Sequence, residues 1–135
     1  MSGILLPVLP KRTYDFTGLD LSVPESQLIL ERIDASEFVE AIVILRVHSA
    51  SAAGGTIKIQ LYEDGYCKWD PGLKFLQNIA ALQIDSTTVA PKLIASGRVV
   101  QGQLISLGIE GNRTSAAQLT ATISIDLCLR TSEDS

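Results

Sequence analysis

The stretch EAIVILRVHSASAAGGTIKIQLYEDG, residues 40–65, contains two runs in which apolar residues recur at every second position. In the second run the apolar residues extend from Ile57 to Leu61, and the residues between them are polar. This alternation is typical of a β-strand with one buried and one solvated face. The small residues at 49–55, which include two glycines in succession, favour a turn. The stretch therefore predicts two strands joined by a turn.

The first run differs because it is apolar on both sides. One row extends from Val39 to Val47 at every second position, but Ile42 and Ile44 lie on the opposite side. A strand with two apolar faces is expected at the centre of a sheet, with its second face covered by a loop or by another subunit. Ile42 and Ile44 are therefore candidate subunit-contact residues.

The same alternation marks a long strand over residues 118–130. Weaker patterns predict strands at 14–21, 26–34, 79–85 and 104–110, and a short one at 92–95. Residues 72–81 fit either one or two helical turns or the start of a strand, and turn signals fall at 63–65, 69–72 and 110–114. Seven or eight short strands without a long helix predict an all-β chain, a single antiparallel β-sandwich of jelly-roll or Greek-key type.

The composition indicates one folded domain and excludes several functions. The chain has 135 residues, of which 46% are hydrophobic and 19% charged, and its net charge is −4. We expect no nucleic-acid partner, because the few basic residues are scattered. We expect no membrane partner, because no apolar run reaches the roughly 20 residues that span a bilayer.

The N-terminus lacks the basic start of a secretion signal, so we expect the protein to be made in a cytoplasm. Thiols usually stay reduced there, which favours two separate free cysteines at Cys67 and Cys128. The alternative, a disulfide between them, stays open because their spacing in the sequence does not show whether they are close.

Catalytic and metal-binding residues are not predicted. His48 is the only histidine, and no turn of the nucleophile-elbow kind presents a partner for a hydrolytic triad, so we interpret it as a structural residue at a strand end. A zinc site lacks donors. Asp64, Asp70 and Asp85 could supply calcium ligands in loops, but loop aspartates commonly serve turns, and we predict no metal and no other cofactor.

The first twelve residues are expected to form an extended arm. Its apolar side chains are interrupted by Pro7 and Pro10, which remove backbone donors and disfavour an interior strand. We predict that the arm, residues 1–12, lies on a neighbouring subunit, that the sandwich spans 13–131, and that 132–135 form a polar tail. The arm's candidate subunit-contact residues are Ile4, Leu5, Leu6, Val8 and Leu9.

An aromatic cluster offers an alternative function. Tyr62, Tyr66 and Trp69 lie within eight residues of one another, beside Asp64. Aromatic rings on a loop can stack on sugars while a carboxylate accepts hydroxyl hydrogen bonds. The cluster could therefore serve a carbohydrate-binding module, or it could simply cover one end of the sandwich.

The order of the segments DASEFVEAIVILRVHSA (34–50), GGTIKIQLYEDG (54–65) and ATISIDLCLR (121–130) resembles small β-sandwich structural proteins of tailed phages and related particles. The similar families are capsid decoration and minor head proteins, and the likeness spans about residues 14–130. It implies a non-enzymatic protein that binds a major capsid or other particle protein and forms a homo-oligomer. The implied location is the virion, assembled in the host cytoplasm, or the cytoplasm if the protein is not viral.

Overall fold

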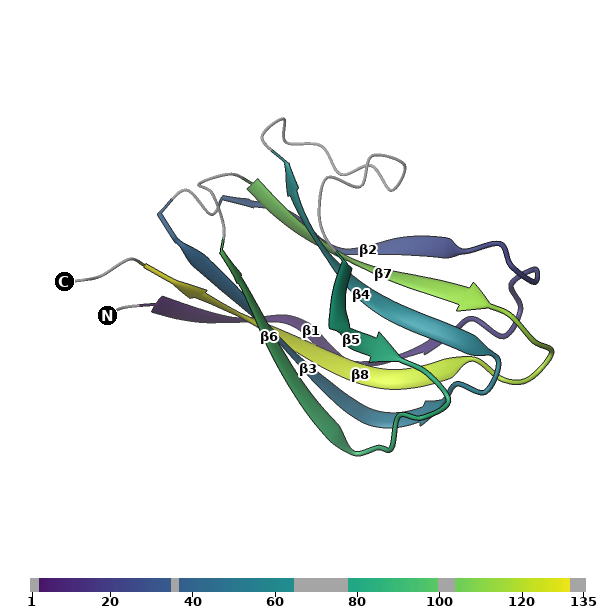
Figure 1. Ribbon diagram of the computed structural model, residues 1–135. Helices are drawn as coiled ribbons and strands as arrows, with labels where there is room; N and C mark the ends of the chain where they lie inside the picture. The colour runs from purple at the N-terminus through teal and green to yellow at the C-terminus, as the bar shows by residue number, and fades with distance from the viewer. Residues whose placement is uncertain (1–2, 35–36, 65–77, 100–103, 132–135) are drawn as a thin grey trace.

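The computed structural model describes residues 3–34, 37–64, 78–99 and 104–131, which form two four-stranded sheets packed face to face (Figure 1). In chain order the strands are β1 (Gly3–Asp15), β2 (Glu25–Asp34), β3 (Glu40–Ser51), β4 (Gly55–Asp64), β5 (Asn78–Ile84), β6 (Lys92–Val99), β7 (Leu104–Arg113) and β8 (Thr120–Arg130).

The strands pair as in one long hairpin folded over on itself. β1 pairs with β8, β2 with β7, β3 with β6 and β4 with β5, and all four pairs are antiparallel. Antiparallel pairs of β3 with β8 and of β4 with β7 complete sheets of order β1-β8-β3-β6 and β2-β7-β4-β5. This is the topology of an eight-stranded jelly roll, so the predicted fold class is confirmed.

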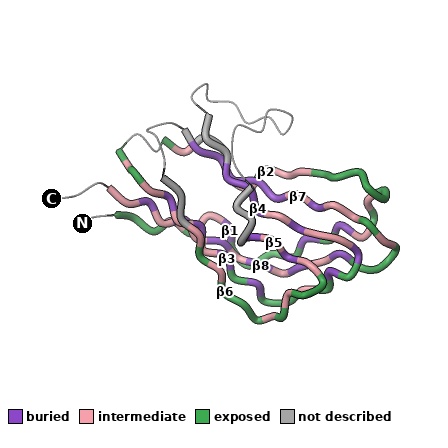
Figure 2. Tube along the Cα trace, viewed as in Figure 1, coloured by how far each residue is buried: buried purple, intermediate pink, exposed green. Residues whose placement is uncertain are grey.

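The core lies between the inner faces of the two sheets (Figure 2). Along β8 every second residue from Ala121 to Leu129 is buried, and the polar residues between them are half-buried. The inner rows of β3, β4 and β7 are equally buried. Burial contributes on the order of 25 cal/mol per Å² of apolar surface. The burial of these alternating apolar side chains is therefore the main contribution to the stability of the sandwich.

Phe16 closes the core beneath β7. Its ring is 2% exposed and stacks on Tyr14, with the ring centroids 6.2 Å apart. The ring also lies against Gly111, where a Cβ atom would collide with it. Gly111 is therefore required by the close approach of Phe16 rather than by its backbone angles.

The β3–β4 turn depends on its two glycines. Gly55 has a φ of 155°, which residues with a side chain rarely adopt. A Cβ atom at Gly54 would collide with the carbonyl oxygen of Ala117. The predicted turn at 49–55 is thus correct in place but narrower, because β3 extends to Ser51 and β4 begins at Gly55.

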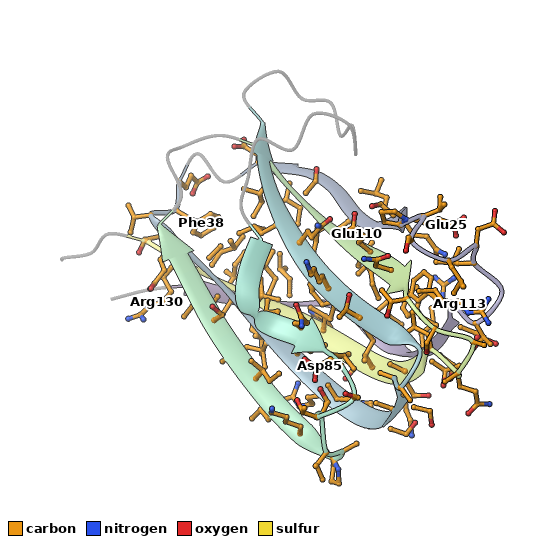
Figure 3. All side chains as sticks on the ribbon, turned by 45° about the vertical axis from the view of Figure 1, so that its right-hand side comes forward. Glu25, Phe38, Asp85, Glu110, Arg113 and Arg130 are labelled. Atoms are coloured by element: carbon orange, nitrogen blue, oxygen red, sulfur yellow. The ribbon has the colours of Figure 1, made fainter. Side chains whose placement is uncertain are left out.

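Arg113 ties two connections together at one end of the sandwich, the end opposite Arg130 (Figure 3). Its Nη1 donates to the carbonyl oxygen of Leu19 at 2.9 Å, and its Nη2 donates to that of Ala116 at 3.2 Å. The turn predicted at 110–114 is wrong, because β7 continues through Arg113 and the connection starts after it.

Three other sequence predictions are corrected. The strand predicted at 14–21 instead ends at Asp15, and residues 16–24 connect β1 to β2. The short strand predicted at 92–95 continues to Val99, because it pairs with β3 along its whole length. The helical alternative for 72–81 does not hold from Asn78 onward, where β5 begins, and residues 72–77 lie outside the described residues.

The structure also differs from the expected N-terminal arm. From Gly3 the segment forms β1, an edge strand paired with β8, so the expected boundary at residue 12 falls inside a strand. An edge strand needs backbone donors on one side only, and the pairing has register shifts between Pro7 and Leu9 and between Leu9 and Arg12. Prolines exclude an interior strand, but they are compatible with this edge position.

Candidate interaction surface

The outer face of the sheet β1-β8-β3-β6 gathers apolar side chains from three strands. In the register, Leu5 of β1 lies opposite Cys128 of β8, which in turn lies opposite Ile42 of β3. One row further along, Ile44 lies opposite Asp126. We call Leu5, Ile42, Ile44 and Cys128 the outer apolar band. It crosses the sheet at right angles to the strands.

The band is accessible to solvent in the isolated chain. Leu5 is 60% exposed, whereas Ile42, Ile44 and Cys128 are half-buried by their neighbours in the sheet. The inner-facing side chains of β3, by contrast, are at most 1% exposed. The sequence prediction that Ile42 and Ile44 lie away from the core therefore agrees with their placement, and nothing in the described residues covers them completely.

Charged residues beside the band are paired with one another. Arg46 Nη1 lies 2.6 Å from Asp126 Oδ2, and Arg130 Nη1 lies 3.2 Å from Glu40 Oε1. These partly exposed pairs contribute little to the free energy of unfolding. Their two positive and two negative charges cancel, so these two pairs add no net charge beside the band.

The expected contact residues of the N-terminal segment separate into two groups. Leu9 is 7% exposed and belongs to the core, and Leu6 and Val8 pack against that core from a half-buried position. Ile4 and Leu5 are 45% and 60% exposed. Leu9 is therefore withdrawn from the contact set, while a subunit contact by Ile4 and Leu5 remains a proposal.

His48 forms a hydrogen bond between two strands. Its Nε2 lies 3.0 Å from Ser124 Oγ, across the β3–β8 pair. In the described part of the chain no carboxylate bonds its other ring nitrogen, and the neighbouring Asp126 is engaged by Arg46. Ser124 lies on a regular strand, without the strained turn of an activated nucleophile. The non-enzymatic role stays a prediction.

Asp85 serves the turn that follows β5 (Figure 3). Its Oδ1 accepts hydrogen bonds from the backbone N–H and the hydroxyl of Thr87, and its Oδ2 accepts one from Gln83. These bonds, with those from Thr87 the strongest, hold the pKa of Asp85 below its usual value. Across the ranges that the structure describes, no three His, Cys, Asp or Glu side chains gather as a metal site would require.

The outer face of the other sheet is mainly polar, although Leu28 of β2 is exposed on it. Glu110 accepts hydrogen bonds from Ser26 Oγ at 3.4 Å and from Gln60 Nε2 at 3.5 Å, which links β7 to both of its neighbours. Gln60 is 2% exposed and Ser106 is 5% exposed, although both alternate with core residues and point away from the core. Hydrogen bonds across the strands therefore join several polar side chains of this face.

Most residues of the alternative carbohydrate site lie outside the part of the chain that the structure describes. Tyr66, Cys67, Trp69 and Asp70 lie outside the described residues, and of Tyr62 and Asp64 only the backbone, within β4, is described. Carbohydrate binding by this cluster stays a prediction. Cys128 is a free thiol on the outer face of β8.

Sequence patterns did not identify Leu93 as a surface residue. It is 61% exposed on β6, on the same outer face as Arg46, which lies opposite it in the register. Ala95 lies opposite Ile44 and so continues one row of the outer apolar band to the second edge of the sheet, while Leu93 is the next residue of β6 on that outer face. The sequence indicates the exposure of Leu93 only weakly, because Leu93, Ile94 and Ala95 are consecutive apolar residues without alternation.

Comparisons with known proteins bear on the fold. No protein-family model matches the chain, and no curated protein matches it. Among solved structures, that of infectious bursal disease virus strain Gx matches with a TM-score of 0.64 and 15% identity, over 95% of this chain and 31% of that one. The VP2 subviral particle of the same virus matches with a TM-score of 0.64 and 14% identity, over 95% and 32%.

These matches define the class of fold and no more. At such identities they show a two-sheet jelly roll like the one in the virus particles. The chain spans about a third of the length of the proteins it matches. Within the described residues, no helix is both long and apolar enough to cross a membrane.

Proposed function

We propose that this chain is a non-enzymatic structural protein of a virus-like or phage-like particle, which binds a capsid shell protein and its own copies. The observation that carries the proposal is the outer apolar band. The outer face of the other sheet carries hydrogen-bonded polar side chains, with Leu28 as an exposed apolar residue, and the described residues show no comparable apolar row there.

The chemistry of the band suits a protein partner. Leu5, Ile42 and Ile44 supply apolar surface, and the ion pairs beside them leave no net charge to attract nucleic acid or an anionic surface. Apolar patches framed by polar residues are typical of protein–protein contacts. The capsid-like fold supports the same role, and we propose on that basis that the protein acts in the virion as a decoration or minor head protein.

The test compares one substitution on the two sheets. Ile44→Lys adds a charge to the band, whereas Leu28→Lys adds the same charge to β2 of the other sheet, where Leu28 is 38% exposed. We expect wild type and Leu28→Lys to co-sediment with particles isolated from the source, and Ile44→Lys to be lost from them while remaining folded by circular dichroism. Absence of the wild-type chain from particles, or equal binding by both variants, would contradict the proposal.

A further inference from the structure

The four edge strands of the sandwich differ in how regularly they pair. The β1 pairing contains two register shifts and β1 carries two prolines, the β2 pairing contains two shifts, and the β5 pairing contains one. β6 pairs with β3 from Lys92 to Val99 without a shift, and it has no proline. Bulges and prolines protect a sheet edge from pairing with other chains. β6 is therefore the edge most suited to accept another strand.

The side chains of β6 also suit an additional strand. Leu93 and Ala95 are exposed on the outer face, and Ile94 is half-buried at the rim of the core. A single exposed leucine is common and needs no explanation. Here, however, the exposed apolar residues lie on the one regular edge, and one of them, Ala95, lies opposite Ile44 of the outer apolar band.

We propose that β6 pairs antiparallel with β6 of a second copy about a two-fold axis at Ile94. This inference rests on the self-association in the proposed function and names its interface. Around this axis Ile94 lies opposite Ile94 of the partner subunit, Leu93 opposite the partner's Ala95, and Lys92 opposite the partner's Ser96. The pairs are the same in both directions, as a two-fold interface requires.

Charge selects this register over its neighbours. An axis at Ala95 places Lys92 opposite Arg98, and like charges directly opposite each other destabilise a strand pair. An axis at Leu93 places Lys92 opposite Ile94, and an axis at Ser96 places Arg98 opposite Ile94, so each sets a basic residue against an apolar one. Only the axis at Ile94 joins apolar residues to apolar residues and leaves each charge without a like neighbour.

The pairing would produce one continuous sheet from two copies, in the order β1-β8-β3-β6-β6-β3-β8-β1. It would place two outer apolar bands on one face of that sheet. The dimer would therefore offer a shell protein a wider apolar surface than one chain does, with the edges at β1 protected by Pro7 and Pro10.

Disulfide trapping tests the register. In chains in which Cys67 and Cys128 are replaced by serine, we would introduce Ile94→Cys and, as matched controls, Leu93→Cys and Ser96→Cys. Residues directly opposite in an antiparallel pair have Cα atoms about 4.5–5.5 Å apart, within disulfide reach, whereas diagonal neighbours lie farther away. Mild oxidation should give a covalent dimer for Ile94→Cys and leave the two controls mainly monomeric on a non-reducing gel.

A second measurement uses the unaltered chain. Amide hydrogen exchange in β6 should slow as protein concentration rises, and exchange in β2 should not change. Equal crosslinking at all three positions, a dimer at Leu93 or Ser96 instead of Ile94, or concentration-independent exchange in β6 would each overturn the inference. Its failure is distinguishable from that of the proposed function, because the particle-binding test uses Ile44 and Leu28 and requires no change in β6.

Discussion

The two sheets share one core but present different outer faces to solvent. On β1-β8-β3-β6, Leu5, Ile42 and Ile44 form part of an apolar band, and the charges beside it are paired. On β2-β7-β4-β5, Gln60 and Glu110 belong to a hydrogen-bonded polar surface. The inner faces are alike, since both consist of buried aliphatic rows.

The difference shows that the fold does not account for the band. Apart from Leu28, the described side chains on the outer face of one sheet are mainly polar, so the fold type by itself does not call for an apolar row on the other sheet. Exposed apolar surface also carries a risk of non-specific association. A partner for the band stays a proposal, and the following predictions test whether the inner and outer faces of the two sheets behave as differently as their burial indicates.

The largest effect is expected on the inner faces, where the sheets should behave identically. Ile125→Ala on β8 and Ile109→Ala on β7 each remove a side chain with 0% exposure. Each should lower the free energy of unfolding by about 2–5 kcal/mol, through lost burial and the cavity left behind. Urea unfolding of both variants provides the measurement. A cost below this range for only one of them would show that the sheets differ inside as well as outside.

An intermediate effect is expected on the polar outer face. Gln60→Ala removes a buried amide that donates to Glu110, and the loss of its packing together with this hydrogen bond should cost about 1–3 kcal/mol. Lys58→Ala, on the same face of the same strand but less buried, is the control and should stay within about 0.5 kcal/mol of wild type. Chemical unfolding would measure both. If Gln60→Ala were neutral, the hydrogen-bonded network would not stabilise this face.

The smallest effect is expected at His48, beside the band. His48→Gln keeps a side chain able to bond Ser124, and it should cost at most about 1 kcal/mol in thermal unfolding. Particle association should be unchanged, because the substitution leaves Leu5, Ile42 and Ile44 intact. A hydrolytic activity present in the wild type and absent from a folded His48→Gln chain would overturn the non-catalytic interpretation.

The sequence predicted the elements of this fold well where alternation was strict. The rows around Ile57–Leu61 and Ala121–Leu129 are buried as expected, because period-two patterns report directly which side of a strand avoids water. It also placed Ile42 and Ile44 on the face away from the core. Prediction failed for the N-terminal segment, because Pro7 and Pro10 fit an extended arm and an edge strand equally well, and only the pairing with β8 distinguishes the two.

The sequence by itself therefore determined that this chain is a β-sandwich and which residues its strands turn inward. Only the tertiary structure decided the order of the strands, and with it the meeting of Leu5, Cys128 and Ile42 in one row. The physical reason is that burial is a local property of each strand and leaves a periodic signal. A surface built across strands depends instead on register between segments more than 80 residues apart, such as Leu5 and Cys128, and no local pattern encodes that pairing.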